Sequence, residues 1–417
     1  MSWQPREKME LKRDFVELAA REGANLRDLC RRFGISPPTG YKWLARFREL
    51  GLAGLDELPR RPKLSPRQTS GDLEARVVAV RLAHPAWGGR KIRWWLENQG
   101  VTGVPAVSTV TEILRRHDLL KIPAGPSGTG WQRFERAAPN ELWQLDFKGW
   151  FRILGGGRCY PLTMLDDHSR FNLLLEPCRG ETLGEVRPLL ERVFSTHGLP
   201  DAILCDNGSP WGDSAGHFTK FEAWLLRLGV KVYHGRPRHP QTQGKEERFH
   251  RTFGDEVLSP ARTWQDLEHC GQVFRSWREI YNHERPHDSL GGKVPASRFG
   301  NSERVMPAQL PEAGQWYGEG DRVKKVNHRG AILFKQVLWA VGEALNGEEV
   351  ALRQIGEQRF EVYYCWKKLG VIDLSTRGEH AGGRHGVIIE KPSSRRIVKD
   401  PPIRPETESV KDVSEQV

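Results

Sequence analysis

Apolar residues recur at helical spacing through the first fifty residues of the chain. The stripes cover residues 15–19, 26–33 and 41–47. This period of about 3.6 residues predicts three short helices. Gly34 ends the second helix, and Ser36 is placed to cap the third. Short helices joined by a glycine turn are typical of a helix-turn-helix unit, here over residues 1–55. A three-helix bundle without a ligand is the alternative.

A second helical pattern follows over residues 72–122. Apolar residues run from Leu73 to Val80, a turn follows at 87–89, and two more helices are expected around 91–99 and 108–117. Ser108 is a plausible N-cap. We therefore predict a second helix-turn-helix-like domain. Pro-rich or Gly-rich linkers flank it at 56–71 and 123–139.

The pattern then changes to strands, which predicts a layered α/β domain over residues 140–300. A strand at 142–147 is followed by a glycine turn at 155–157. Further strands are expected at 159–165, 170–175, 202–205 and 230–233, and helices at 181–197, 218–228, 243–253 and 264–282.

Short β segments dominate the last part of the chain. They cover residues 322–326, 336–341, 349–354 and 360–364. With the loop-like residues 301–314 before them, they predict a small barrel of four or five strands at 315–374. The polar residues 375–417 are expected to be disordered. The fold class expected is therefore multidomain, α, then α/β, then β.

The charge of the chain points to a polyanionic partner. The 417 residues carry a formal net charge of +11, and residues 1–136 hold 25 Lys and Arg against 15 Asp and Glu. Almost all of the excess thus precedes the α/β domain, as in a DNA-binding front end on a catalytic core. The alternative is an ordinary solvated basic surface.

The cysteines and the hydropathy give no sign of secretion. The six cysteines include no Cys-x-x-Cys pair, which argues against a cysteine-based zinc finger and a disulfide scaffold. No apolar run is long enough to span a membrane, and the first residues lack a signal-peptide core. We expect a soluble cytoplasmic protein.

Three carboxylates lie in distinctive settings within the α/β domain. Asp146 lies in a strand, Asp206 follows a short buried strand, and Glu247 lies on a helix. The first two are separated by 59 residues and the last two by 40. Carboxylates brought together by a fold can hold two Mg²⁺ ions, which serve to cut and join phosphodiester bonds. For any one of these acids, a solvated, capping or turn role is the alternative.

The flanking sequences resemble those of bacterial insertion-sequence transposases with a retroviral-integrase-like catalytic core. The segments are Leu-Cys-Asp-Asn-Gly-Ser at 204–209, His-Pro-Gln-Thr-Gln-Gly-Lys-Glu-Glu-Arg-Phe-His-Arg-Thr at 239–252 and Tyr-Asn-His-Glu-Arg-Pro-His-Asp-Ser-Leu at 281–290. The likeness of the core covers about 140–300, and the helical units and the barrel extend it to nearly the whole folded length.

This resemblance implies a ribonuclease-H-like core and a polynucleotidyl transferase of the Asp-Asp-Glu type. Asp146 would bridge two Mg²⁺ ions, and Asp206 and Glu247 would complete one ion each; Mn²⁺ also suits such a site. The enzyme would bind the terminal inverted repeats of an insertion sequence, nick the DNA ends and join the 3′-OH to target DNA. A homo-oligomer on paired ends is implied as well.

Several neighbouring residues compete for these roles. The family pattern places a structural turn at Asp166 and Asp167. Glu246 is the rival of Glu247, although the family spacing favours Glu247. His250 could contact DNA, support the site or be a surface histidine. Arg285 and His287 could brace the core or contact DNA.

The expected DNA contacts come from three parts of the chain. The recognition helix would present Thr39, Tyr41, Lys42 and Arg46, and the basic linker would add Arg60, Arg61 and Lys63. The core would contribute Lys148, Gln243, Lys245, Arg248, His250 and Arg251. Lys148 could equally be an ordinary edge-strand charge.

Three other functions compete with a transposase. A metal-dependent nuclease of the same fold would cut without joining, and it leaves the two helical units and the barrel without a clear purpose. A regulator derived from a transposase would have lost catalysis, yet all three carboxylates are present. A helix-turn-helix transcription factor leaves the acidic triad unexplained.

Overall fold

The computed structural model describes residues 8–57, 69–120, 135–212, 218–235, 244–258, 262–376 and 385–386. The chain divides into two compact units, Met1–Thr69 and Ser70–Val417. The predicted tail, 375–417, lies mostly outside the described residues, as do residues 58–68 and 121–134 of the two predicted linkers. Among the described helices, none is both long and apolar enough to cross a bilayer.

The first unit contains the three helices that the apolar stripes predict. They are α1 (Lys8–Ala19), α2 (Leu26–Arg32) and α3 (Pro37–Leu50), followed by a short 3₁₀ helix at Gly51–Leu55. Phe15, Cys30 and Trp43 are buried between them. Helix α3 passes close to α1 at Gly40, where an added Cβ would lie 2.8 Å from the Phe15 ring. The first helix-turn-helix arrangement is thus present, and the burial of Trp43 fixes the face that α3 leaves exposed.

The second helical unit is formed by α4 (Gly71–Ala83), α5 (Gly89–Asn98) and α6 (Val107–Arg116) around a core that includes Trp87, Ile92 and Val110. One detail of the prediction is wrong. Helix α6 begins at Val107 after Ala106 as its N-cap, so Ser108 lies inside the helix and does not cap it.

Helix α5 docks against the end of the α/β domain. The Lys91 ammonium lies 2.8 Å from one oxygen of Asp288, and the Arg90 guanidinium lies 3.2 Å from the other. The Asn98 amide donates to the carbonyl of Gly292 at 3.0 Å. The Trp94 ring covers Gly292 so closely that an added Cβ would lie 2.5 Å from it. The second helical unit therefore has a defined contact with the core.

The core is built on a mixed sheet. Its strands are β1 (Trp143–Phe147), β2 (Phe151–Arg152), β3 (Arg158–Asp166), β4 (Asn172–Cys178), β5 (Ala202–Cys205) and β6 (Lys231–His234). The order is β2-β3-β1-β5-β6, with β4 on the other side of β3. The strands β1 to β4 pair antiparallel, whereas β1, β5 and β6 pair parallel. This arrangement agrees with the α/β core predicted from the alternating pattern.

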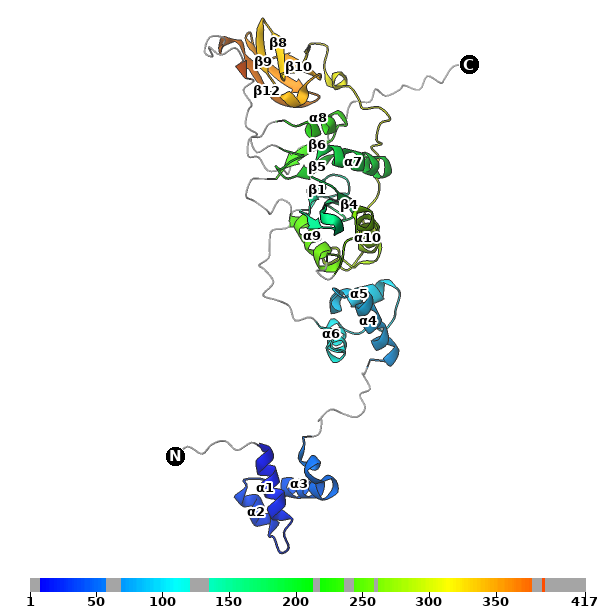
Figure 1. Ribbon diagram of the computed structural model, residues 1–417, viewed down its shortest axis with the longest axis vertical. Helices are drawn as coiled ribbons and strands as arrows, with labels where there is room; N and C mark the ends of the chain where they lie inside the picture. The colour runs from blue at the N-terminus through cyan, green and yellow to red at the C-terminus, as the bar shows by residue number, and fades with distance from the viewer. Residues whose placement is uncertain are drawn as a thin grey trace, which may run out of the picture. The chain divides into compact units, whose positions relative to one another are not determined.

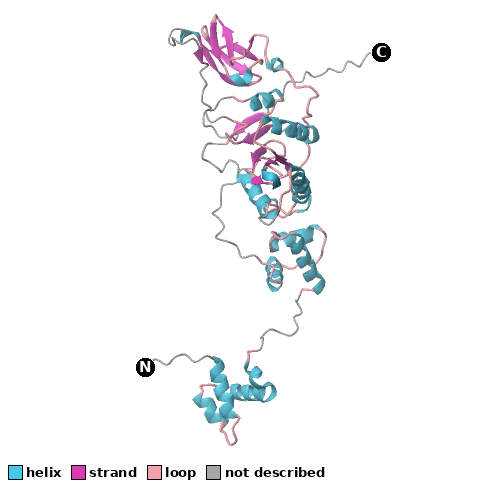
Figure 2. Ribbon diagram, in the orientation of Figure 1, coloured by secondary structure: helices cyan, strands magenta, loops and turns pink. Residues whose placement is uncertain are grey.

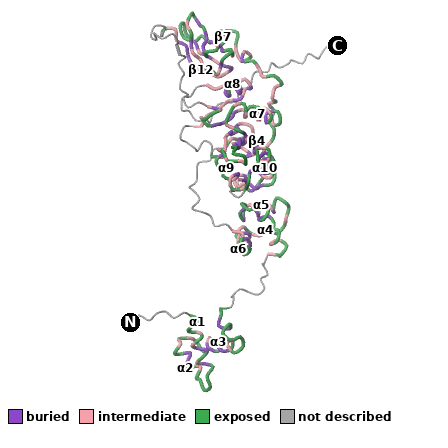
Figure 3. Tube along the Cα trace, viewed as in Figure 1, coloured by how far each residue is buried: buried purple, intermediate pink, exposed green. Residues whose placement is uncertain are grey.

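Helices cover both faces of the sheet (Figures 1 and 2). On one face, α7 (Leu183–His197) and α8 (Lys220–Arg227) pack on a core that includes Trp143, Leu145 and Met164. On the other face, α9 (Gly244–Glu256) and α10 (Leu267–Glu279) pack through Phe249, Phe253 and Phe274. Helix α10 continues as a π-helical turn at Ile280–Glu284. Figure 3 shows the buried positions concentrated in this layered region.

The C-terminal part consists of two sheets. Its strands are β7 (Arg322–Lys325), β8 (Ala331–Phe334), β9 (Val337–Ala340), β10 (Glu349–Gln354), β11 (Arg359–Tyr364), β12 (Lys367–Asp373) and β13 (His385–Gly386). Within the described residues the sheets have the orders β12-β11-β10-β7 and β13-β9-β8, and the closed barrel expected from the sequence is not confirmed.

Three of these strands were not predicted: β13 lies in the tail that was expected to be disordered, and β8 and β12 adjoin turns that lack the usual residues. The β8–β9 turn uses Lys335 and Gln336, and the β11–β12 turn uses Cys365, all with positive φ. Such tight hairpins normally carry Gly, Asn or Asp at positive φ. The pattern therefore gave no signal that a strand ended there.

Helix α8 joins the core to this C-terminal part. Its residues Ala223 and Leu226 belong to the C-terminal apolar core. Beside them, Arg227 lies 3.1 Å from Glu348, and Glu222 lies 3.0 Å from Lys367. The intervening residues 301–314 also contact the core, because the Arg304 guanidinium donates to the carbonyl of Gly229 at 2.8 Å.

Gly292 and Gly291 offer a matched test of the α5 contact. Both have positive φ, of +87° and +65°, but only Gly292 is covered by Trp94. We expect Gly292→Ala to weaken the docking of α5 by about 1–3 kcal/mol beyond the effect of Gly291→Ala, because the added methyl group overpacks the contact. Hydrogen exchange of the α5 amides measures this difference. Equal exchange in the two variants would show that the contact does not hold the helix.

Candidate active site

The pairing of β1 with β5 brings the first two predicted ligands to one edge of the sheet. The strands run parallel, with Trp143 opposite Ile203 and Gln144 opposite Leu204. Two residues further along each strand are Asp146 and Asp206. In mixed α/β sheets, ligands bind beyond the carboxyl ends of the parallel strands. The two carboxylates therefore lie where substrates approach such a sheet.

Asp146 lies on the α9 face of the sheet, because Leu145 and Phe147 on either side of it pack into the opposite core. Its side chain is 23% exposed, and one oxygen accepts from the Phe147 amide at 2.9 Å. Burial, and next the charge of Asp206, raise the pKa of Asp146 to about 7. The neighbouring Asp206 is exposed and accepts from the Gly208 amide at 2.9 Å. The pair is thus electrostatically strained without a cation.

A buried polar cluster supports Asp146 from below. Thr163, opposite Asp146 on β3, donates to the Asp146 carbonyl at 3.0 Å. Its hydroxyl also lies 3.0 Å from Glu246 and 2.8 Å from the Nε2 atom of His250. His250 in turn places Nδ1 3.8 Å from the Asp146 carboxylate. Burial lowers the pKa of His250 to about 3, so the imidazole is neutral.

The two candidates for the third ligand point in different directions. The Glu246 side chain is fully buried, and burial followed by the charge of Asp146 raises its pKa well above the ordinary value. The Glu247 side chain is 64% exposed and lies 3.5 Å from Arg251. Helix α9 thus turns Glu246, and not Glu247, toward Asp146. Among the described residues, no group of three or more His, Cys, Asp or Glu side chains forms a metal site.

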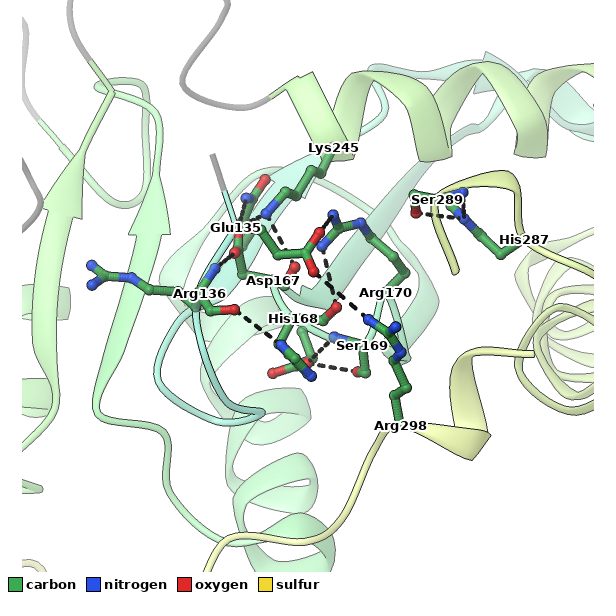
Figure 4. Close-up of polar contacts among 12 residues, drawn as sticks. Glu135, Arg136, Asp167, His168, Ser169, Arg170, Lys245, His287, Ser289 and Arg298 are labelled. Atoms are coloured by element: carbon green, nitrogen blue, oxygen red, sulfur yellow. Dashed lines mark hydrogen bonds and ion pairs between the residues drawn. The ribbon is translucent and has the colours of Figure 1, made fainter. Parts of the chain in front are cut away.

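The turn between β3 and β4 anchors the start of α9 (Figure 4). Asp166 accepts from the Ser169 amide and hydroxyl, at 2.7 and 2.6 Å, which stabilises the turn. Asp167 accepts from the Arg136 amide at 2.8 Å and from Gln144 at 2.7 Å, and it forms an ion pair with Lys245. The structural role expected for the two aspartates is confirmed. Lys245, a predicted DNA contact, points its ammonium group into this turn.

Arginine residues brace the same region. Figure 4 shows Arg170 and Arg298 next to Glu135; Arg170 lies 2.7 Å from one carboxylate oxygen and Arg298 lies 3.8 Å from the other. Arg285 pairs with Glu256 of α9 at 2.8 Å. His287 is partly buried and lies 2.9 Å from the Ser289 hydroxyl. The bracing alternative for Arg285 and His287 thus agrees with their contacts.

The other predicted DNA contacts are distributed over both units. On α3, Tyr41 and Lys42 are exposed, Arg46 is partly exposed, and Thr39 lies 2.9 Å from Ser36. Lys148 is partly exposed, Arg248 and Arg251 are exposed on α9, and His250 is buried. Arg60, Arg61, Lys63 and Gln243 lie outside the described residues.

The sequence did not reveal Thr163 or the partner of Lys245. If the hairpin were symmetric about Gly156, Asp146 would lie opposite Asp166. The irregular backbone at Gly149, with φ of +88°, and the short 3₁₀ turn at Leu154–Gly156 shift the register, and Thr163 takes that place. A glycine directly after a predicted strand was the available signal, because such glycines often mark a bulge.

Comparison with protein families agrees with this architecture. The chain matches a helix-turn-helix domain at residues 11–63 and a homeodomain-like domain at 39–114. An integrase core domain matches at 136–240 and again at 228–295. The C-terminal domain of the IS481 family transposases matches at 321–380.

Curated relatives include proteins of two bacterial insertion elements. The 39.2 kDa protein of IS476 from Xanthomonas euvesicatoria is 27% identical over 273 residues, which cover 64% of this chain and 75% of that protein. The 31.7 kDa protein of IS407 from Burkholderia multivorans is 29% identical over 178 residues, 43% of this chain and 61% of that protein. The chain is a relative of the bacterial insertion-sequence transposases with an integrase-like core. Its helix-turn-helix units and its integrase core domain fit this relationship.

Retroviral integrases are among the solved structures to which the chain is similar. The HTLV-2 integrase catalytic core domain in complex with magnesium is 15% identical, covers 39% of this chain and 97% of that chain, and has a TM-score of 0.28. A simian T-cell lymphotropic virus intasome chain is 16% identical, covers 71% of this chain and 98% of that chain, and has a TM-score of 0.32.

The raised pKa of Asp146 predicts a pH-dependent gain in stability for Asp146→Asn. The folded protein holds this proton up to about pH 7, whereas the ordinary pKa is 3.8, so the contribution of Asp146 to stability is lost as the pH rises through that window. Without divalent metal, Asp146→Asn should be more stable than the wild type at pH 8, by up to roughly 4 kcal/mol, and similar to it at pH 4.

Urea unfolding at the two pH values measures the effect. Asp255→Asn is the control, because Asp255 is an exposed acid on α9. A gain for Asp146→Asn that is the same at both pH values would contradict the assigned cause.

The Asp167–Lys245 ion pair predicts strong coupling between its members. The Asp167 side chain is fully buried and that of Lys245 is 16% exposed. Lys245→Met leaves a buried carboxylate without its cation, which should cost roughly 3 kcal/mol of core stability. The double variant with Asp167→Asn should recover part of that loss. A double-mutant cycle in urea with no coupling energy would show that the pair does not anchor α9.

Proposed function

We propose that the chain is a DNA transposase. It binds the terminal inverted repeats of an insertion sequence, nicks each end in a divalent-metal-dependent step and joins the resulting 3′-OH to target DNA. The observation that carries this proposal is the parallel β1–β5 register, which sets Asp146 and Asp206 side by side at the open edge of an integrase-like core.

Two of the three expected metal ligands, Asp146 and Asp206, are positioned to suit a hard divalent cation. Both aspartates offer oxygen ligands, which Mg²⁺ and Mn²⁺ prefer. The charge of Asp206 raises the pKa of Asp146, a repulsion that a bound cation would relieve. Glu247 does not fit in the described conformation, since its carboxylate faces Arg251. We propose Glu247 as the third ligand after its side chain leaves Arg251, because the family motif places the acid three residues after the glycine, here Gly244.

The residues of the chain have separate tasks in this reaction. Asp146 and Asp206 would hold two Mg²⁺ ions, or Mn²⁺, and Glu247 would complete the site from α9. Ions held there would serve to activate a water or 3′-OH and to stabilise the leaving oxygen. Thr163 and His250 hold the strand that carries Asp146, as their hydrogen bonds indicate. Lys245 anchors α9 through Asp167, and the exposed Arg248 and Arg251 remain available to DNA phosphates.

The helical units are the part of the chain that would bind DNA. Helix α3 exposes Tyr41 and Lys42, and a recognition helix of this kind lies in the major groove. We propose that the two helical units bind one terminal inverted repeat and that a homo-oligomer holds the paired ends. The ion pair between Lys91 of α5 and Asp288 keeps the second helical unit close to the core.

A DNA-binding regulator without catalysis is the second candidate. One observation favours it: the described residues form no three-ligand metal cluster, and Glu247 is turned away. Such a protein would bind the DNA ends and leave them intact.

Adjacent glutamates provide a matched test of the transposase proposal. Glu247→Gln should lower metal-dependent nicking of end-bearing DNA at least about 100-fold, because a ligand is lost while DNA binding persists. Glu246→Gln replaces the carboxyl group of the buried neighbour by an amide of the same shape, whose oxygen can still accept from Thr163, so nicking should fall less than about tenfold. Mn²⁺ binding by calorimetry should follow the same order.

Asp206→Asn serves as the positive control for loss of the site. The reverse order, with Glu246→Gln inactive and Glu247→Gln active, would reassign the third ligand to Glu246. No nicking by the wild type with Mg²⁺ or Mn²⁺ on paired ends, despite tight binding, would favour the regulator.

A further inference from the structure

The hairpin formed by β2 and the start of β3 projects past the catalytic edge of the sheet. Strand β4 ends at Cys178, opposite Tyr160, so the hairpin tip at Leu154–Gly156 extends beyond it. The backbone is held in place, because the Ile153 amide donates to Gly157 at 3.0 Å and the Leu154 amide donates to Trp264 at 2.8 Å. The projection is therefore an ordered element.

The two faces of this hairpin have opposite character. Phe151 and Ile153 pack into the apolar core beneath α9 and α10. The alternate residues face outward: Trp150 is 47% exposed, Leu154 is 61% exposed, and Arg152 is exposed. This period of two is that of a strand with one covered and one open face. The open face presents an aromatic ring where an ordinary edge strand would present polar groups.

Two arginines lie opposite each other on the open face. Arg152 on β2 pairs directly with Arg158 on β3, and the Arg158 guanidinium lies 4.1 Å from the centre of the Trp150 ring. Like charges directly opposite each other on a sheet are destabilising. Within the described ranges, neither arginine forms an ion pair with a carboxylate. A neighbouring acid thus does not balance the repulsion, and an external anion can.

The location and the chemistry together fit duplex DNA. Trp150 lies four positions after Asp146, a reach of at most about 14 Å. Duplex DNA carries one phosphate charge per 1.7 Å or so of its axis, and half a turn is roughly 17 Å. The hairpin and the carboxyl ends of β1 and β5 lie at the same edge of the sheet, so a duplex that reaches this edge from the face opposite to α9 can also extend over the hairpin. Arginines bind its phosphates, and an exposed aromatic or leucine side chain can contact its sugars and bases.

We propose that Trp150, Arg152 and Arg158 form a binding surface for the target duplex. This inference rests on the proposed transposase function, in which two duplexes meet at one pair of carboxylates. The hairpin cations lie on the sheet face opposite to α9, which carries Arg248 and Arg251. The surface offers phosphate contacts and apolar groups without a set of base-reading amides or carboxylates, which suits DNA of arbitrary sequence. The DNA ends of the element itself would instead be bound by the helical units and α9.

The test measures binding of full-length protein to a short duplex of random sequence over a range of salt concentrations. Arg152→Gln/Arg158→Gln should weaken this binding about tenfold or more at low salt and reduce the salt slope by about 2, since two phosphate contacts are lost. Trp150→Ala should weaken binding several-fold without changing the slope. Affinity for a duplex that carries the element's end should change less than about twofold.

The control variant removes two charges from elsewhere on the core. Arg187→Gln/Arg192→Gln has the same net charge as the hairpin variant, but both arginines are paired with carboxylates on or beside α7. Unchanged affinity and slope in the hairpin variant, or the same loss in the control, would overturn the proposal. A loss confined to the end-bearing duplex would overturn the assignment to target DNA. These binding measurements stand whether or not the wild type nicks DNA, so failure of the catalytic proposal is seen separately.

Discussion

Everything that the core can do depends on the parallel pairing of β1 with β5. The two strands are separated by more than fifty residues of hairpin, helix and loop, yet they share the register Trp143–Ile203 and Gln144–Leu204. That register alone brings Asp146 and Asp206 together. A shift by one residue would turn Asp146 toward the apolar α7 side and break the site, because side chains alternate along a strand. The apolar packing on both faces of the sheet therefore fixes the catalytic geometry.

This geometry has an electrostatic cost, which the rest of the core offsets. Two carboxylates side by side and partly buried disfavour ionisation, and the raised pKa of Asp146 expresses this cost. Buried aromatic residues, among them Phe249, Phe253 and Trp277, hold α9 and α10 on the same face. Binding of a cation would convert the local repulsion into attraction. In the proposed function, a divalent metal would therefore offset a cost in stability that the carboxylate pair imposes in its absence.

Much of this arrangement could be predicted from the sequence. The apolar stripes of Phe15 and Leu29 predicted helices that are present, and the settings of Asp146 and Asp206 predicted a strand and a strand end. Local pattern cannot show long-range register, however, so the hydrogen bonds of Thr163 and the ion pair of Lys245 were not expected. The orientation of α9 about its own axis could not be predicted from the sequence pattern for a related reason. Glu246 and Glu247 are adjacent, and packing of Phe249 decides which of them faces the sheet.

The C-terminal part shows the same limit. Strands bounded by glycine or asparagine turns were found, whereas the turn at Lys335 and Gln336 carries no such signal. Whether strands close into a barrel depends on pairings between residues far apart, and the described strands form two sheets. The contact of α8 with Glu348 and Lys367 likewise joins segments that no local pattern relates.

The most direct test of the account is a crystal structure of the full-length protein grown with Mn²⁺, in which anomalous scattering locates the metal. The account predicts Mn²⁺ bound by oxygens of both Asp146 and Asp206, with a Glu247 oxygen completing the coordination after its side chain has left Arg251. Anomalous density that is absent from the edge where β1 and β5 end, at saturating Mn²⁺, would contradict the central claim that this register builds a metal site.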